Sequence, residues 1–357
     1  MIRRPLLALA ASALALATTP AVAQDEPLKV GFVYVGPVGD HGWTYQHDQG
    51  RQAIEAAYGD RVETTFVESV SEGPDAERVI RQLASSGHGL IFTTSFGFMD
   101  PTIEVAKQFP DVRFEHATGY KQADNVATYS ARFYQGRHII GKIAGELTET
   151  NTIGYIASFP IPEVIRGINA ATLAARSVNP EVETQVVWVN TWYDPGKEAD
   201  AARALINQGA DIIMQHTDSP AALQAAEQAG VKAFGQASDM ARFAPNVQLT
   251  AIIDDWAPYY VERAGQALDG EWQAHDVWHG LEEGMVKMAP YQNMPEETAA
   301  MARETEAALT AGEIHPFAGP VVDRDGETRV AEGETPSDEA MLGMDYFVEG
   351  VVGDLPN

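Results

Sequence analysis

KVGFVYVGPVGDHGWTYQHDQGRQAIEAAY, residues 29–58, is the stretch that decides the fold of this chain. It opens with an apolar, β-branched run from Val30 to Val35, breaks at Gly36, and resumes at helical spacing through Ile54. This pattern predicts a strand, a loop and a helix. In an open α/β sheet, ligands bind beyond the carboxyl ends of the strands, so we expect the loop around Trp43 to contact one.

The rest of the first half repeats this alternation of extended and helical segments. Strands are predicted at residues 61–67, 90–93, 113–116 and 126–130, and helices at 75–86, 101–109 and 135–147. Alternation at this rhythm is typical of βαβ units around a parallel sheet.

The second half of the chain resembles the first. The alternation restarts at Thr152, and RQLASSGHGLIFTTS (81–95) aligns with RALINQGADIIMQHT (203–217), which places Gly87 opposite Gly209. The duplication predicts an α/β protein of two Rossmann-like lobes with parallel central sheets. Two lobes also suit a chain that is too long for one hydrophobic core.

The end of the chain is expected to cross between the lobes. A late strand at 247–253 and a helix at 256–268 would return to the first lobe, and a helix at 295–311 to the second. Multiple crossings would form a hinge. We therefore predict an N-terminal lobe of residues 27–131 plus 253–277 and a C-terminal lobe of residues 132–252 plus 278–350.

The first 23 residues have the features of a secretory signal peptide. A basic start at residues 1–4 precedes an apolar run at 6–17 and the small-x-small site Ala21-Val22-Ala23. The apolar run is shorter than the roughly 20 residues of a spanning helix. We expect cleavage after Ala23 and a periplasmic protein that is not a lipoprotein, since the chain has no cysteine.

Composition and motifs argue against several function classes. With 51 acidic and 24 basic residues the net charge is −27, which disfavours nucleic acid and anionic membranes as partners. Residues 136–142 fit the P-loop spacing, but Ile143 stands where Ser or Thr must hold Mg²⁺. The chain has no H-E-x-x-H, no G-x-S-x-G and no cysteine nucleophile. We expect no catalytic residues, no metal and no cofactor.

Four stretches resemble the BMP family (basic membrane protein, nucleoside-type) of substrate-binding proteins for ABC importers. They are GDHGWTYQHDQG (39–50), FPDVRFEHATG (109–119), VNTWYDPGKEADAARALINQGADIIMQ (189–215), and the tail PFAGPVVDRDG with MDYFVEGVVGDLP. The resemblance implies a type I periplasmic-binding-protein fold and a small-molecule ligand that is handed to an ABC permease in the inner membrane. We expect a monomer.

The resemblance also implies that a ring is held between two aromatic side chains, at positions that fall on Trp43 and Trp192. Stacking on an aromatic side chain is worth about 1–3 kcal/mol per base. Core packing is the alternative for each tryptophan, although both follow a strand among polar residues.

Other candidates come from their places in the chain. Asp40, Asp218 and Asp239 lie at predicted strand-to-helix loops, where an ionised carboxylate can accept from a base N–H and where a helix N-cap is the alternative. Phe96 ends a strand and is expected in the cleft or in the core. Tyr134 follows the first crossing, from where it could reach the ligand.

The sequence departs from the family pattern at three positions. Thr44 replaces an asparagine, Ala237 replaces an acidic residue that meets the sugar, and Asp254 replaces a lysine. A ribose would lose partners, so we expect a purine-like ligand, with a free base such as adenine favoured over a nucleoside. The alternatives are an exported nucleoside-processing α/β enzyme, a binding protein for another aromatic solute, or a sensory binding protein.

Overall fold

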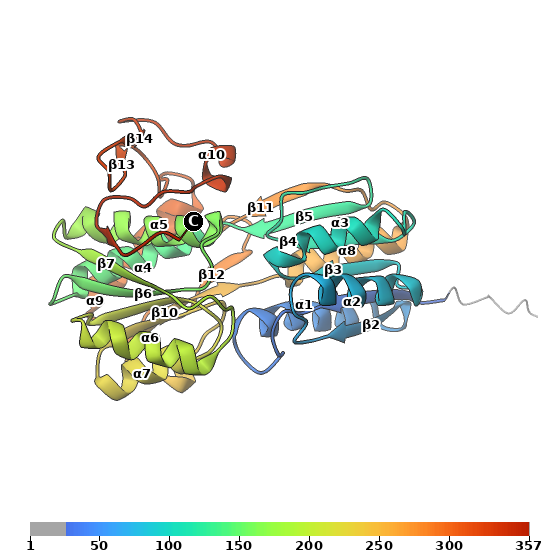
Figure 1. Ribbon diagram of the computed structural model, residues 1–357, viewed down its shortest axis with the longest axis horizontal. Helices are drawn as coiled ribbons and strands as arrows, with labels where there is room; N and C mark the ends of the chain where they lie inside the picture. Colours follow the sequence, from blue (N-terminus) through green and yellow to red (C-terminus); the bar gives the residue numbers. More distant parts are fainter. Residues whose placement is uncertain (1–25, 357) are drawn as a thin grey trace, which may run out of the picture.

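The computed structural model describes residues 26–356 as two α/β lobes side by side (Figure 1). The predicted signal peptide lies outside these residues. Within them, no helix combines the length and apolar character needed to cross a bilayer.

The first lobe is built on a six-stranded sheet in the order β11-β5-β4-β3-β1-β2, and every pair in it is parallel. Its strands are β1 (Leu28–Val33), β2 (Val62–Val67), β3 (Leu90–Thr93), β4 (Arg113–Ala117), β5 (Val126–Ala131) and β11 (Asp276–His279). Helices α1 (Gly42–Tyr58) and α8 (Ala257–Asp269) pack together on one face, and α2 (Pro74–Ser85) and α3 (Met99–Ala106) pack together on the other.

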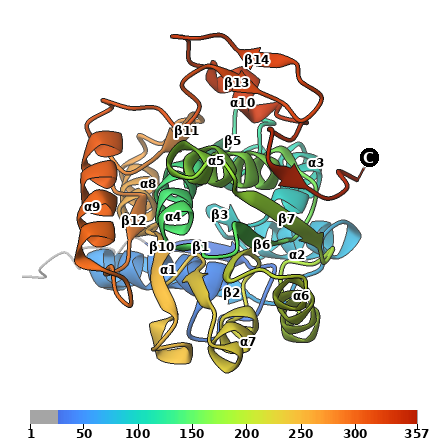
Figure 2. The same cartoon turned by 90° about the vertical axis from the view of Figure 1, so that its left-hand side faces the viewer.

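The second lobe is built on a seven-stranded sheet in the order β12-β10-β9-β8-β6-β7-β15, in which only the β10–β12 pair is antiparallel. Its strands are β6 (Thr152–Ala157), β7 (Glu183–Trp188), β8 (Ile212–His216), β9 (Lys232–Gly235), β10 (Gln248–Asp254), β12 (Val286–Met288) and β15 (Val351–Val352). Figure 2 shows α4 (Phe133–Leu147), α5 (Pro162–Val178) and α9 (Glu296–Thr310) away from α6 (Pro195–Asn207) and α7 (Ala221–Ala229), which lie across the sheet. The tail adds β13 (Val321–Val322), β14 (Thr328–Val330) and α10 (Asp338–Leu342).

The strand orders confirm the predicted duplication. The order β5-β4-β3-β1-β2 in the first sheet has its counterpart in β10-β9-β8-β6-β7 in the second. The aligned glycines Gly87 and Gly209 both have positive φ, 90° and 105°, just after α2 and α6. A Cβ at either position would meet no atom within 4 Å, so the backbone conformation rather than space requires glycine.

Alternation along β1 shows that the first sheet is covered on both faces. Phe32 lies in the core under α1 with Ile54, whereas Val33 lies in the core under α2 with Ile80, and all are fully buried. Successive residues of a strand point to opposite faces, so a strand buried on both sides reads as a continuous apolar run.

The late strand-helix pair differs from the sequence prediction. The strand β10 stays in the second sheet beside β9, and only α8 and β11 return to the first lobe. The reason is the duplication: β10 is the counterpart of β5, so it completes its own sheet before the chain leaves. The chain passes between the lobes after β5, after β10 and after β11.

Residues 136–142 form part of α4, as expected for a segment that is not a P-loop. The glycines of α4 instead allow close helix packing. A Cβ on Gly141 would lie 2.3 Å from the carbonyl oxygen of Ala171, and one on Gly145 would lie 2.4 Å from that of Ala175, both on α5. Only glycine permits this approach.

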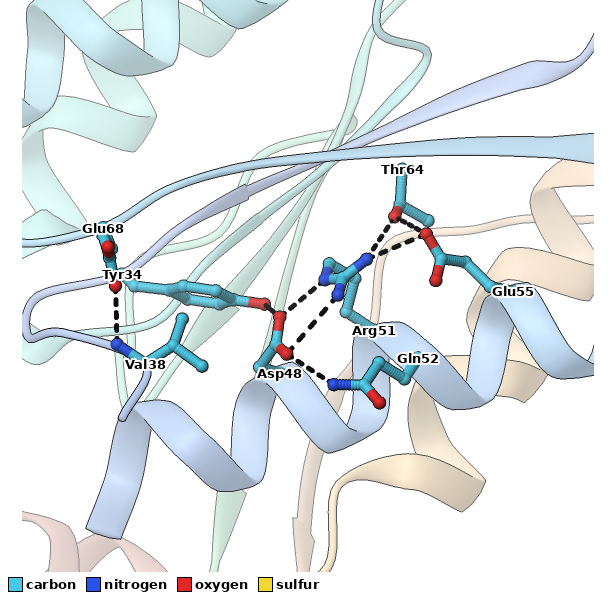
Figure 3. A network of polar contacts seen from close by, with 8 residues as sticks. All are labelled: Tyr34, Val38, Asp48, Arg51, Gln52, Glu55, Thr64 and Glu68. Carbon is cyan, nitrogen blue, oxygen red and sulfur yellow. Dashed lines mark hydrogen bonds and ion pairs between the residues drawn. The ribbon is translucent and has the colours of Figure 1, made fainter. Parts of the chain in front are cut away.

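A polar network fixes α1 against β1 and β2 (Figure 3). Asp48 on α1 accepts hydrogen bonds from the hydroxyl of Tyr34 at 3.3 Å and from Arg51 Nε at 2.6 Å. Arg51 also donates to Thr64 on β2 at 2.8 Å. In the loop before α1, the backbone N–H of Val38 donates to Glu68 at 2.7 Å. These contacts fix the position of α1 on the sheet and therefore the position of its first turn.

Candidate functional site

A cavity lies between the lobes at the carboxyl ends of both sheets. The first lobe contributes Val35, Trp43, Ser95, Phe96 and Thr118, and the second contributes Glu163, Trp192, His216, Asp218 and Gln236. Its empty volume is about 380 Å³, including space open to solvent. We call this cavity the slot.

Trp43 lies in the first turn of α1 and is held within the first lobe. Its indole Nε1 donates to the carbonyl oxygen of Thr94 at 2.7 Å. The ring makes edge contacts with His47 and with the fully buried Trp256, at centroid distances of 4.4 and 5.4 Å. These contacts fix the plane of the half-buried ring at the slot.

Trp192 lies in the loop after β7 and is held by both lobes. Its carbonyl oxygen accepts from the backbone N–H of Asp218 at 3.0 Å, and its ring packs against Phe159 at a centroid distance of 5.1 Å. Its indole Nε1 donates across the lobes to Glu72 at 3.1 Å.

Glu198, buried on α6, ties the Trp192 loop to the Asp218 loop. One carboxylate oxygen accepts from the backbone N–H of Asp194 at 2.9 Å. The other accepts from the backbone N–H and the hydroxyl of Ser219 at 3.0 and 2.7 Å. The two loops of the second lobe that face the slot are therefore held as one unit.

Asp218 lines the slot and does not cap α7, the helix that follows it in the chain. The hydroxyl of Ser219 instead accepts a hydrogen bond from the backbone N–H of Ala221, in the first turn of α7, at 3.3 Å. Withdrawal from water, reinforced by the charge of Glu198, raises the pKa of Asp218 to about 8, while the backbone N–H of Trp43 acts in the opposite direction. Asp218 is therefore mostly protonated at neutral pH and can donate as well as accept.

The structure brings four of the seven predicted site residues together and leaves three away from the slot. Trp43, Phe96, Trp192 and Asp218 all line it. Asp40 is exposed and pairs with His41 and with Arg242 of the other lobe. Asp239 is exposed and accepts from the backbone N–H of Ala241 at 3.0 Å, which is a local turn contact.

Tyr134 is buried beside the first crossing rather than in the slot. Its hydroxyl accepts from Arg132 at 2.8 Å, and its ring makes an edge contact with Trp278 at 5.6 Å. The position after the crossing therefore serves packing at the junction of the two lobes, since the ring of Tyr134 contacts Trp278 of β11 and Phe317 of the tail.

Three polar residues that the second lobe contributes to the slot were not found from the sequence: Glu163, His216 and Gln236. His216 ends β8 and Gln236 follows β9, so the rule that ligands meet strand ends could have indicated both. Glu163 is in the first turn of α5, the counterpart of the turn that carries Trp43. Burial lowers the pKa of His216, whose Nε2 lies 3.5 Å from Glu163, so the imidazole is neutral at pH 7.

A group of buried polar atoms without protein partners lies beside the slot. Both carboxylate oxygens of the fully buried Asp254 lack a hydrogen-bond partner. The Nε of Arg137 also lacks one, although Nη2 of the same guanidinium donates to Gln236. Burial raises the pKa of Asp254 well above its ordinary value, and the charges of Glu163 and Asp218 add to this. Buried polar atoms are normally paired, so these are suited to a polar ligand.

In the part of the chain from 26 to 356, no group of three or more His, Asp or Glu side chains is arranged to hold a metal ion. The slot thus combines aromatic faces from both lobes with hydrogen-bonding groups, chiefly from the second lobe, among which Asp218 is mostly protonated and His216 is neutral. Such a site can stack a flat ring and bond to its polar edge.

Comparison with known proteins adds a family and a fold. Residues 28–314 match the family model Bmp, described as ABC transporter substrate-binding protein PnrA-like. The chain is 58% identical over 332 residues to a purine-binding protein of Brucella abortus, which covers 93% of this chain and 95% of that one. It is 41% identical to a Haloferax volcanii protein named provisionally as an ABC transporter glucose-binding protein, over 94% of this chain and 83% of that one.

Solved structures share the architecture at lower identity. A solute-binding protein from Aeropyrum pernix superposes with a TM-score of 0.70 at 17% identity and covers 81% of this chain and 93% of its own. One from Conexibacter woesei gives a TM-score of 0.63 at 22% identity, over 81% and 98%. Both are ABC transporter solute-binding proteins, and the likeness supports the two-lobed fold.

Proposed function

This chain belongs to the Bmp family of PnrA-like ABC transporter substrate-binding proteins, and we propose that it captures a purine base between its lobes and delivers it to an ABC permease. Adenine is the favoured ligand, ahead of its nucleoside. The proposal includes export to the periplasm and the absence of catalytic turnover, because the family and the Brucella relative are binding proteins.

The observation that carries the proposal is the pair of tryptophans that line the slot. Trp43 comes from the first lobe and Trp192 from the second, and both line the same cavity. A flat aromatic ring offers two faces for stacking, which suits a cavity with an aromatic side chain from each lobe. The name of the Brucella relative, a purine-binding protein, points to the same ligand class.

The polar groups favour a base over a riboside. A ribose brings two vicinal hydroxyls, and each one buried without a partner costs about 1–3 kcal/mol. Ala237 has only a methyl side chain to offer and Asp239 faces solvent, so neither position of the family's acidic pair presents a carboxylate to these hydroxyls. The unpaired oxygens of Asp254 are better matched by the ring and exocyclic N–H groups of a base.

The test is a ligand identification followed by calorimetry. Mass spectrometry of the small molecules released on denaturing the purified protein should identify a purine. Titrations should then rank adenine, guanine and hypoxanthine above their ribosides, with glucose as the competing ligand suggested by the Haloferax relative. A riboside that binds more tightly than its own base would overturn the preference for free bases.

Two further outcomes would overturn more of the proposal. Tight binding of glucose without purine binding would replace the ligand class. Release of base or sugar from nucleosides by the purified protein would favour the nucleoside-processing enzyme instead.

A further inference from the structure

One carboxylate of the first lobe contacts the stacking tryptophan of the second. Glu72 lies in the loop between β2 and α2, and its Oε1 accepts from the indole Nε1 of Trp192 at 3.1 Å. The same oxygen accepts from the hydroxyl of Ser95 at 2.6 Å and from the backbone N–H of Gly97 at 3.1 Å. The latter two contacts are within the first lobe.

We propose that Glu72 is a positioning residue that holds the Trp192 indole against the ligand only when the lobes are closed. The proposal rests on the proposed function, since it assigns how one wall of the same slot is held. Under this proposal, base stacking and lobe closure depend on each other. The first lobe orients the Trp192 indole through Glu72, and Glu72 gains this hydrogen bond only when the indole is correctly placed.

The contacts of Trp192 divide between the two lobes. Its backbone is held by the second lobe through Asp218, but the indole N–H has its hydrogen-bond partner in the first lobe. Trp43 differs, because its indole N–H donates to Thr94 within its own lobe. Opening the lobes therefore leaves the Trp43 hydrogen bond intact and breaks the Trp192 hydrogen bond.

The atoms around Glu72 hold its carboxylate in one defined position. A Cβ on Gly97 would lie 2.1 Å from the carboxylate carbon and 2.4 and 2.5 Å from its oxygens. Any side chain at this position would displace the carboxylate. Ser95 and the Gly97 N–H thus fix the acceptor before Trp192 arrives, which limits the ordering cost of closure.

The test is a double-mutant cycle read by calorimetry with adenine. Glu72→Ala and Trp192→Phe should each weaken adenine binding about three- to tenfold, because a hydrogen bond to an exposed carboxylate is partly replaced by water. Trp192→Phe keeps a ring but has no N–H. The double variant should bind no more weakly than the weaker-binding single variant, since both changes remove one contact.

Three variants separate this role from a general structural effect. Glu72→Gln keeps an acceptor oxygen and should bind adenine within about twofold of wild type. Gly97→Ala should reproduce the Glu72→Ala loss while Glu72 is still present. Glu77→Ala changes an exposed carboxylate that pairs with Arg81 in the first lobe, and should leave affinity unchanged. Stopped-flow measurements should assign the Glu72→Ala loss to faster dissociation, since the bond forms after encounter.

Additive losses in the double variant, wild-type affinity in Glu72→Ala, or an equal loss in Glu77→Ala would overturn the role of Glu72 while leaving purine binding intact. Failure of the wild-type protein to bind adenine would overturn the proposed ligand, and the role of Glu72 with it.

Discussion

Replacing either slot tryptophan by alanine should weaken purine binding by one to two decades. The ligand ring would lose one of its two stacking faces in each variant, and one face is worth about 1–3 kcal/mol, or about fivefold to 150-fold in affinity. Trp43→Ala and Trp192→Ala should therefore have similar effects on affinity. They should differ in their effect on the fold.

The difference follows from how each ring is held. Trp43 packs on Trp256 and donates to Thr94, so its removal costs about 1 kcal/mol for the hydrogen bond and more for the lost packing. Trp192 lies in a surface loop, and its ring contacts Phe159 and Glu72. We expect a measurable drop in melting temperature for Trp43→Ala and a small one for Trp192→Ala.

The assay is calorimetry with adenine at fixed salt and pH, with circular dichroism as the check on folding. Trp43→Phe is the control that retains a smaller stacking face and loses the N–H, and it should keep affinity within about tenfold. In the wild type, ligand should quench or shift tryptophan fluorescence. Unchanged affinity in both alanine variants, with the fold intact, would refute the sandwich.

Three further predictions concern protonation and closure. Burial and the charge of Glu198 raise the pKa of Asp218 to about 8 from an ordinary value near 4, and we expect the part of this shift that the first lobe supplies to couple closure to proton uptake between these limits. Adenine affinity should accordingly fall as pH rises from 5.5 to 8, by up to about tenfold per pH unit. Proton uptake on binding can be measured by calorimetry in buffers of different ionisation enthalpy, and Asp218→Asn should abolish it. Equal proton uptake in the wild type and in Asp218→Asn would contradict this. Gly42→Ala should weaken adenine binding at least tenfold. The alanine Cβ would lie 2.6 Å from the carbonyl oxygen of Asp218 in the other lobe, and position 42 has a φ of 79°. Wild-type affinity in this variant would show that the lobes need not approach this closely. The radius of gyration should shrink on adding adenine, and identical scattering curves for ligand-free and saturated protein would argue against closure.

Local patterns were enough to predict most of the fold. The predicted strand at 90–93 matches β3, and the predicted helix at 75–86 is within one residue of α2 at both ends. These elements are buried on one face or two, so their apolar spacing reports their type directly. The late strand was expected to return to the first lobe together with its helix, although the predicted boundary kept residues 132–252 in the second, because spacing shows that a strand exists but not which sheet it joins.

The site was predicted less completely, and for a physical reason. Trp43, Phe96, Trp192 and Asp218 follow strand ends, which the chain order reveals. The aspartates at 40 and 239 also follow strand ends, but their side chains turn to Arg242 and to a local backbone N–H. Glu72 has no signal in sequence, because its contact to Trp192 exists only through the placement of one lobe on the other.

The two lobes repeat one topology but contribute different chemistry to the slot. The first lobe supplies uncharged residues, such as Trp43, Phe96 and Thr118, whereas the second supplies the ionisable ones, Glu163, His216 and Asp218. When the first lobe covers the second, it removes water from these groups without adding a positive charge. Burial in the slot favours the neutral forms of Asp218 and His216, and it raises the pKa of Asp218 and lowers that of His216. A neutral base that can both donate and accept fits such a surface better than a charged ligand, so the unequal division of the slot is itself an argument for an uncharged heterocycle.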